Sequence, residues 1–407
     1  MGKKDQQPRG LERNVVVMCI SFFILTLGYS LWYQLFSVYL DSIGLTTIWI
    51  GTVMTGYNAS VSLTSMPSGR FSDRVGRRTP IMIGGSLIII ITFLLNFSKE
   101  PISILLLMIS FGFSMGLMVP SANALIAESI SSKHSGIAYS GFYVSMQAAN
   151  IVGSALSGFI ASQYGYSSWF FLGILLTMIS VIFMYVYIKE NMLRKSSYIA
   201  EFKNSVTTSF SGTISLLRSE KELTLLTIAL SIHSFSFYLL YPYVSLFAVK
   251  SIFLNETQAG IVVSFWMFGI TMALFPAGLM TDKLGGRITI LIHVILSSFS
   301  WSLYTISQNF QIAIITMFIF GSVAALDMPA RRAIMMEFST EESGNATIIG
   351  TLDSITGMSG IIAPFIGGII WNTFGYYMPF IIGSLINLCA SIPLLSLARR
   401  KRVKRNY

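Results

Sequence analysis

Long apolar runs recur along the whole chain and alternate with short polar intervals. Each run approaches the roughly 20 residues that cross a bilayer as a helix, and strand-like alternation of apolar and polar positions is absent from the runs. A spanning segment must satisfy its own backbone hydrogen bonds, which favours helices. The pattern predicts an all-α membrane protein with twelve transmembrane helices, at 15–40, 48–68, 80–98, 102–127, 137–161, 168–188, 222–247, 257–281, 288–307, 310–336, 346–371 and 377–398.

A charged phrase occurs twice along the chain, at residues 69–78 and 278–287, and each copy joins two apolar runs. The copies are 209 residues apart, and the same offset relates Glu128 to Glu337. A register that is kept over such a length indicates an internal duplication. We therefore expect two pseudo-symmetric six-helix bundles, as in membrane proteins that are built from repeated halves.

The longest polar interval separates the two halves. Apolar residues recur within it every three or four positions, which predicts an amphipathic helix on the inner membrane surface; a plain tether is the alternative. The expected organisation is a cytoplasmic tail at 1–14, an N-terminal bundle at 15–188, the linker at 189–221, a C-terminal bundle at 222–398 and a basic cytoplasmic tail at 399–407.

The composition is that of a chain embedded in lipid. Hydrophobic residues make up 53% and charged residues 11%, and the mean hydropathy is +0.69, which is too apolar for folding around a core in water. If the N-terminus is cytoplasmic, all of the 27 Lys and Arg residues except Lys99 and Lys250 lie on the cytoplasmic side or at its boundary. The positive-inside rule therefore predicts a multi-pass protein of the cell (plasma or inner) membrane with both termini in the cytoplasm. The net charge of +10 follows from this bias and needs no nucleic acid as a partner.

The first copy of the charged phrase reads GRFSDRVGRR and the second reads GLMTDKLGGR. The phrase resembles the signature loop between the second and third helices of the major facilitator superfamily. The six-plus-six arrangement with a long middle loop is similar to that family over essentially the whole chain. The resemblance implies the MFS fold and a secondary transporter that works by alternating access.

Enzyme chemistry is not expected, because the sequence contains no recognisable Ser/His/Asp set, metal-ligand spacing or phosphate-binding loop. We accordingly expect no cofactor and no metal. The expected partners are the lipid bilayer, a small-molecule substrate and H+, and the protein is expected to act as a monomer.

Each copy of the phrase contains residue types that suit a latch at the membrane edge. Gly69 and Gly278 are expected to allow close helix approach or a sharp exit of the chain, and Asp73 and Asp282 offer carboxylates to basic neighbours. The alternative is that the loop only sets topology through its positive charge. The candidate gating residues are Gly69, Asp73, Arg74, Gly76, Arg77, Arg78 and Glu128 in the first half and Gly278, Asp282, Lys283, Gly285, Arg287 and Glu337 in the second.

The resemblance also implies contacts for these loops. In the family, the acid of the first loop caps the N-terminus of the eleventh helix. Carried over, Asp73 would contact residues near 344–347, and Arg74 and Arg78 would be tied to Glu128. The matching residues of the second half would be Asp282 and Glu337.

Two acids lie well inside predicted spans, Asp327 and Asp353. Each costs about 2.5–3.5 kcal/mol on insertion scales, so each requires a partner or a water-filled cavity. Arg331 follows Asp327 by four residues and lies on the same helix face. These three residues are candidates for ion coupling, and the alternative is an ion pair that locks two helices together.

Polar side chains form matched stripes on two predicted helices and extend to a third. Hydroxyl groups can line a solute path or hold membrane helices together, so the set is better evidence than any member. The substrate-cavity candidates are Thr26, Ser30, Tyr33, Ser37, Gln147, Asn150, Ser234, Tyr238, Tyr241 and Ser245. His233 and His293 also lie in predicted spans, where an isolated histidine is more often a packing residue.

A path rich in aromatic and hydroxyl groups and poor in charge suits a small neutral or amphipathic solute. We expect proton-coupled transport, with multidrug-type efflux as the first interpretation and uptake of a metabolite by a symporter or uniporter as the alternative. The family resemblance would imply an Arg within 102–127 for a proton-coupled drug exporter, and none occurs there. A non-transporting membrane sensor is the alternative from another class.

Overall fold

The computed structural model describes residues 9–129, 135–189, 221–337 and 355–399. Among these residues, eleven helices are long and apolar enough to cross a membrane. Three features predicted from sequence lie outside the described residues: Asp353, the expected Asp73 partner at 344–347, and the amphipathic linker helix.

The chain divides into two compact units. The first comprises Met1–Leu45, Gly56–Ser209 and Asn255–Ser264, and the second comprises Thr46–Thr55, Phe210–Leu254 and Phe265–Tyr407. The division follows the two predicted halves except for two short segments. Residues 46–55 group with the second unit and residues 255–264 with the first.

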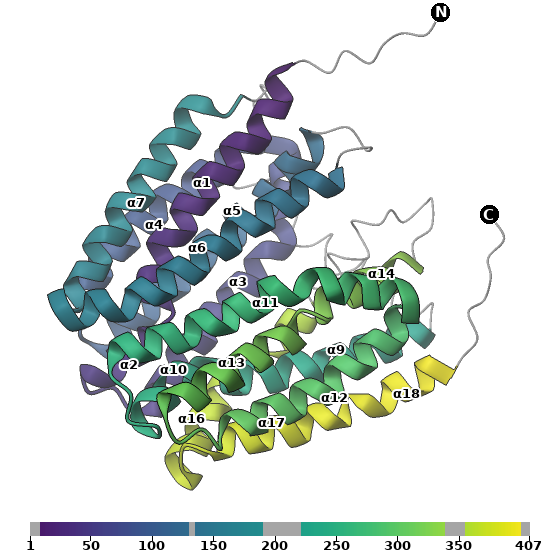
Figure 1. The fold of residues 1–407 in the computed structure, drawn as a ribbon. Coiled ribbons are helices and arrows are strands. Elements are labelled where there is room, and N and C mark those ends of the chain that lie inside the picture. Colours follow the sequence, from purple (N-terminus) through teal and green to yellow (C-terminus); the bar gives the residue numbers. More distant parts are fainter. Residues whose placement is uncertain (1–8, 130–134, 190–220, 338–354, 400–407) are drawn as a thin grey trace, which may run out of the picture. The chain divides into compact units, whose positions relative to one another are not determined.

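The first unit is built from long helices that begin and end near the predicted span limits. They are α1 (Arg9–Tyr33), α2 (Phe36–Ser42), most of α3 (Thr47–Val75), α4 (Arg78–Phe97), α5 (Pro101–Glu128), α6 (Ser135–Tyr164) and α7 (Tyr166–Tyr187). Helix α1 packs against α6 and α7, and α4 packs against α5 (Figure 1). Gly28 and Gly173 permit the α1–α7 contact, since a Cβ on Gly173 would lie 2.9 Å from the Gly28 carbonyl oxygen.

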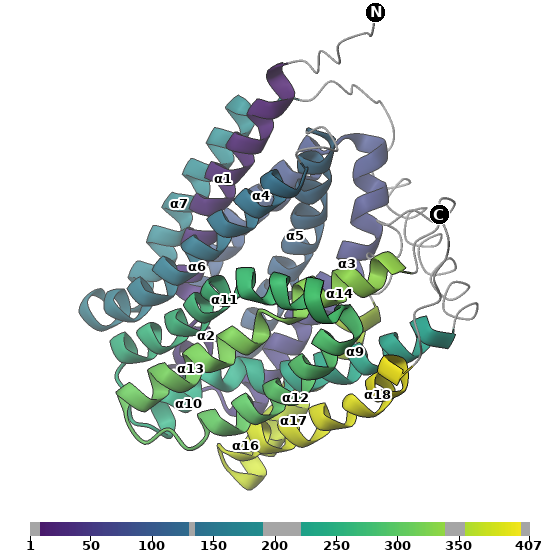
Figure 2. The same ribbon diagram turned by 45° about the vertical axis from the view of Figure 1, so that its right-hand side comes forward.

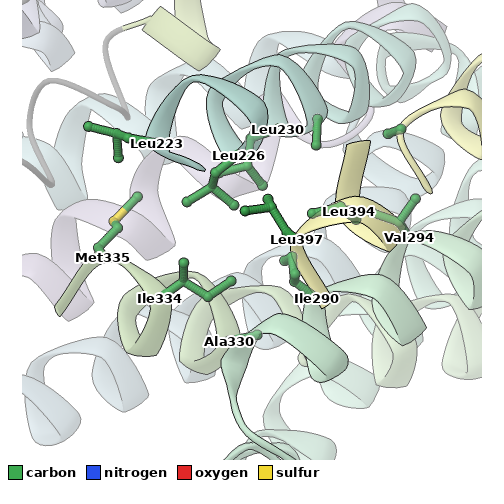
Figure 3. Close-up of a cluster of buried hydrophobic side chains, with 12 residues drawn as sticks. Leu223, Leu226, Leu230, Ile290, Val294, Ala330, Ile334, Met335, Leu394 and Leu397 are labelled. Carbon is green, nitrogen blue, oxygen red and sulfur yellow. The ribbon is translucent and has the colours of Figure 1, made fainter. Parts of the chain in front are cut away.

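The second unit contains more and shorter elements. They are α9 (Lys221–Leu240), the 3-10 turn η2 (Tyr241–Tyr243), α10 (Val244–Lys250), most of α11 (Glu256–Leu284), α12 (Gly286–Tyr304), α13 (Phe310–Ala324), α14 (Asp327–Glu337), α16 (Ala363–Phe374), α17 (Met378–Cys389) and α18 (Ser391–Arg399). Helix α12 packs against α13, α14, α17 and α18, and α9 packs against α17 and α18 (Figure 2). A cluster of buried aliphatic side chains, including Leu226, Ile290, Ile334 and Leu394, joins α9, α12, α14 and α18 (Figure 3).

Several spans that the sequence predicts as single helices are interrupted. The predicted helix 222–247 breaks at η2, where Pro242 lacks the backbone N–H that a continuing helix requires. The predicted helix 310–336 breaks between α13 and α14, so that Asp327 becomes the first residue of a new helix. Such breaks release backbone groups that polar neighbours can satisfy inside a membrane protein.

Helix α3 is not among the eleven candidate spans of the described chain, although it has 29 residues and covers the predicted span 48–68. Its sequence is rich in Ser, Thr and Gly and contains Asn58, which lowers its hydropathy. A spanning helix of this composition is suited to packing against other helices or to facing a polar path rather than lipid.

The backbone confirms the duplication. Gly44 and Phe253 have φ angles of 90° and 58° and lie 209 residues apart. Gly165 and Gly375 have φ angles of 78° and 92° and lie 210 residues apart. Left-handed conformations are rare outside glycine, so their recurrence in one register shows that both halves turn the chain at equivalent places.

Candidate transport and coupling site

Aromatic rings from three helices meet in the first unit. Tyr33 of α1 lies 5.4 Å from Tyr57 of α3, measured between ring centroids, and Tyr57 stacks on Phe111 of α5 at 5.7 Å. Tyr29 lies 6.3 Å from Tyr33, one turn away on α1. Phe111 is buried, whereas the three tyrosines are half-buried.

A second group of rings occurs in the second unit. Phe237 of α9 stacks on Tyr241 of η2 at 5.2 Å, and Tyr241 lies 5.5 Å from Trp266 of α11. Trp266 lies 5.3 Å from Phe320 of α13. Phe237 and Tyr241 are half-buried, and the other two rings form the buried base of the group.

The two groups occupy equivalent positions in the duplicated sequence, and we call them the paired aromatic clusters. Offsets of 208 or 209 residues relate Tyr29 to Phe237, Tyr33 to Tyr241, Tyr57 to Trp266 and Phe111 to Phe320. Sequence reasoning selected only Tyr33 and Tyr241 from this set. The other members could have been found by applying the same offset to aromatic positions instead of polar ones.

The remaining cavity candidates divide into buried and half-buried side chains. Ser30 of α1 donates a 2.6 Å hydrogen bond to Asn150 of α6, and the Asn150 amide lies 3.4 Å from the Gln147 side-chain oxygen. These groups join two helices, as hydroxyl and amide groups commonly do in membranes. Thr26, Ser37 and Ser245 are buried, and Gln147, Ser234 and Tyr238 are half-buried.

Asp327 and Arg331 form an ion pair on the first turn of α14. The Arg331 guanidinium donates to both carboxylate oxygens of Asp327, at distances of 2.9 and 3.1 Å from Nη2. The predicted proximity is confirmed. Both charges are mostly enclosed, with side-chain exposures of 16% for Arg331 and 26% for Asp327, so their mutual neutralisation lowers the cost of placing them in a span.

His233 and His293, which were expected to be isolated packing residues, are in contact. The Nε2 atoms of His233 on α9 and His293 on α12 lie 3.3 Å apart. His233 Nδ1 lies 2.9 Å from the Asn387 side-chain oxygen, and His293 Nδ1 lies 3.0 Å from the Val323 carbonyl oxygen. One ring nitrogen of each histidine and a carboxylate oxygen of Asp327 all lie within 4.8 Å of one another. No local sequence pattern signals this cluster, because its helices are distant along the chain.

Arg77 is the centre of the first signature loop. It forms ion pairs with Asp73 and, at 2.6 Å, with Glu128 at the end of α5. It also donates to the Ser72 hydroxyl at 2.5 Å and to the Gly69 carbonyl at 3.3 Å. Burial lowers the pKa of the Arg77 guanidinium, but the hydrogen bond to Glu128 and both carboxylate charges outweigh it and raise the pKa above its usual value.

The resemblance implied Arg74 and Arg78 as the partners of Glu128. The described partner is Arg77, which lies between them along the chain. Arg77 makes this contact, whereas the contact proposed for Arg74 and Arg78 stays a prediction. Arg78 donates to the Tyr185 carbonyl oxygen at 2.5 Å, and its guanidinium lies 4.9 Å from the Tyr185 ring centroid. Arg77 and Arg78, at the start of α4, thus connect this helix to α5 and to α7.

The second loop uses a different acid. Arg287 pairs with Glu222 of α9 at 2.8 Å. Asp282 and Lys283 are exposed at the end of α11, and the side chain of Glu337 lies outside the described residues. Arg287 is the register equivalent of Arg78, and both donate to a carbonyl oxygen of the last helix of their half, Arg78 to Tyr185 of α7 and Arg287 to Leu397 of α18 at 3.3 Å. The contact with an acid differs between the copies, because Gly286 occupies the position equivalent to Arg77.

The glycines of the loops have separate roles. Gly69 and Gly278 lie inside α3 and α11, and no atom of the described residues lies within 4 Å of a Cβ built on either. The expected close approach at these two positions is not made by any described residue and stays a prediction. The sharp exits of the chain occur instead at Gly76 and Gly285, which follow the helices with φ angles of 94° and 83°.

Repeated helices of membrane-spanning length, shared turns and paired aromatic clusters define a multi-pass membrane protein built by duplication. The model of the Major Facilitator Superfamily matches residues 18–253 and 226–406. The chain therefore belongs to the Major Facilitator Superfamily, whose members are transporters and not enzymes.

Individual relatives agree with this assignment. An MFS-type transporter of Methanocaldococcus jannaschii is 24% identical over 370 residues, covering 90% of this chain and 91% of its own. The multidrug resistance protein MdtG of Salmonella schwarzengrund is 21% identical over 406 residues, covering 97% and 98%.

Solved structures show the same fold. The crystal structure of the nucleoside transporter NupG superposes with a TM-score of 0.76 at 12% identity, covering 95% of this chain and all of NupG. A bacterial homologue of the human lysosomal transporter Spinster superposes with a TM-score of 0.71 at 11% identity, covering 96% of each chain. The predicted twelve-helix MFS fold is therefore confirmed.

Proposed function

We propose that this protein exports hydrophobic and amphipathic small molecules by alternating access, driven by inward movement of H+. The observation that carries the proposal is the paired aromatic clusters. Each cluster combines half-buried aromatic residues with phenol or indole groups, and such groups bind planar apolar solutes and orient their polar ends. The relatives named multidrug resistance protein MdtG, which align over nearly the whole chain, support the same substrate class.

The distribution of charge supports a neutral or weakly charged substrate. Asp327 and Arg331 neutralise one another, so this enclosed pair offers no net cationic site to a polyanion. We further propose that Asp327, Arg331 and Asp353 take part in coupling. The proposed setting is the cell membrane, with both termini in the cytoplasm and the protein acting as a monomer.

Flux into proteoliposomes tests the proposal. A panel of amphipathic dyes and neutral metabolites would be assayed with and without an imposed pH gradient. Tyr33→Ala and Tyr241→Ala should each reduce pH-driven dye flux by about tenfold, which corresponds to a loss of about 1.4 kcal/mol. Phe275→Ala is the matched control, because Phe275 lies on α11 but is 75% exposed outside the cluster.

The outcomes separate the alternatives. Flux of a metabolite in the direction of the proton gradient would replace the exporter with an uptake symporter, and flux that is indifferent to pH would replace it with a uniporter. Saturable dye binding without flux would identify a sensor. Equal flux in Tyr33→Ala, Tyr241→Ala and Phe275→Ala would remove the clusters from the substrate path.

A further inference from the structure

Two histidine rings meet inside the second unit, between α9 and α12. Their centroids are 4.8 Å apart and the rings cross edge to face. His233 and His293 are only 8% and 2% exposed. Where two buried ring nitrogens face one another, one must donate a hydrogen bond and the other must accept it, because an unsatisfied polar contact inside a protein is unfavourable.

Asn387 fixes the proton position of His233. The Asn387 amide nitrogen lies 2.9–3.0 Å from the Val294 carbonyl oxygen and the Ser297 and Ser298 hydroxyl oxygens. Both hydroxyls donate to the Val294 carbonyl, so they accept from the amide. The other end of Asn387 is therefore its oxygen, and His233 Nδ1 must carry the proton that it donates there.

The backbone fixes the proton position of His293. Its Nδ1 lies 3.0 Å from the Val323 carbonyl oxygen, which can only accept. With both Nδ1 atoms protonated, two neutral imidazoles would present unprotonated Nε2 atoms to one another at 3.3 Å. The lone pairs would repel. One additional proton on either Nε2 converts this contact into an N–H donor facing a nitrogen acceptor.

The geometry points to a proton-binding site that His233 and His293 form together, holding one proton between their Nε2 atoms. The proton comes from a hydronium ion of the bulk solution, which leaves a water molecule; it forms one N–H bond, and the cluster gains a single positive charge. The role of this site in coupling rests on the proposed function, whereas proton binding itself does not.

A divalent cation is the other occupant that two imidazoles and a carboxylate suggest. The contacts of Asp327 argue against it, because Arg331 donates to both carboxylate oxygens. A dication would also add two positive charges beside the guanidinium in a low-dielectric interior. One proton adds only one, which the nearby Asp327 carboxylate helps to stabilise.

The charges around the pair are few. Asp327 and Arg331 on α14 are the charged groups that face it within the described chain, while α13, α16 and α17 carry no acidic or basic side chain. A second ion pair, Arg287 with Glu222, also joins α9 and α12 but lies nearer the start of both helices. It offers a matched control on the same elements.

Trp301 connects the histidines to the aromatic cluster of the second unit. Its ring centroid lies 5.7 Å from that of His233 and 6.2 Å from those of Phe237 and Phe320. A proton on the pair places a cation beside the indole and strengthens the link between α9 and α12. The site therefore lies one ring away from the surface proposed to bind substrate.

Histidine ring nitrogens can be observed directly by NMR without any substrate. The full chain, 15N-labelled at histidine and held in lipid nanodiscs, would carry His134→Gln so that only the pair reports. Between about pH 5 and 8, we expect both rings to change together at one midpoint with uptake of one proton. Both Nδ1 atoms should remain protonated throughout.

Two opposite variants separate a charged site from a packing contact. Asp327→Asn removes the favourable negative charge and should move the midpoint to lower pH by at least about one unit. Arg331→Gln removes the repelling charge and should move it to higher pH. Glu222→Gln should leave it unchanged. The parent titration is decisive by itself if either variant fails to fold.

Three results would overturn the site. They are two independent midpoints with two protons, no proton uptake over the range, and a shift of both Nε2 resonances by stoichiometric Zn2+ that EDTA reverses. The flux assay is separate: dye export with no shared proton rejects this site alone, and a shared proton without any flux rejects the proposed function alone.

Discussion

Gly76 and Gly285, 209 residues apart, both turn the chain in the left-handed region directly after a long helix. A side chain there meets its own backbone, which costs about 1–2 kcal/mol. Gly76→Ala and Gly285→Ala should therefore each lower the melting temperature of the purified protein by roughly 1–2 °C. Scanning fluorimetry in detergent measures the change.

Gly69 and Gly278 are matched controls seven residues earlier in the same phrase. Both are helical, and no described atom lies within 4 Å of a Cβ built on either, so Gly69→Ala and Gly278→Ala should raise helix propensity and leave the melting temperature unchanged or slightly higher. Equal destabilisation at all four positions would contradict the assignment of the turn to Gly76 and Gly285.

The Arg77–Glu128 ion pair should make a modest contribution to stability. Arg77 is 12% exposed but Glu128 is 52% exposed, so water screens the pair. A double-mutant cycle with Arg77→Gln and Glu128→Gln should give a coupling energy of about 0.5–1 kcal/mol. Because Asp73 also binds Arg77, Arg77→Gln should be more damaging than Glu128→Gln. The reverse order would mean that Arg77 is not the centre of the loop.

The Asp327–Arg331 pair can be tested for a structural or a coupling role. Asp327→Asn leaves an unpaired enclosed guanidinium and should destabilise the protein by about 3–5 kcal/mol. Asp327→Asn combined with Arg331→Gln removes both charges and should restore much of the lost stability. If the double variant is stable yet fails to respond to a pH gradient, the pair couples transport. Undiminished pH-driven flux would mean that the ion pair has a structural role only and holds helices together.

The orientation in the membrane follows from the distribution of Lys and Arg and can be checked by labelling. In a background with Cys19→Ser and Cys389→Ser, Lys99→Cys should react with an impermeant maleimide in intact cells. Glu201→Cys should react only after permeabilisation, because the positive-inside rule places the linker in the cytoplasm. Labelling of both positions in intact cells would reject this topology.

The spanning helices were predictable from the long apolar runs, because a helix in a bilayer satisfies its own backbone hydrogen bonds and its side chains face apolar lipid. The spans, their number in the family fold and the duplication follow from sequence alone. The breaks were not all predictable: Pro242 signals the interruption at η2, and Pro329, which has no N–H to pair with the Ala325 carbonyl, signals the break before α14. The chain between α1 and α2, by contrast, breaks at Gln34 and Leu35 with no proline nearby. Helix continuity there depends on neighbouring helices as well as local preference.

The sequence by itself determined the lipid-embedded class, the register between the halves, the ion pair between Asp327 and Arg331 and the loops that carry charge, since these depend on local spacing and hydropathy. Only the tertiary structure decided which side chains meet across helices. Arg77 binds Glu128 over 51 residues, and His233 reaches His293 over 60. Such contacts depend on helix packing and rotation, which no local pattern encodes.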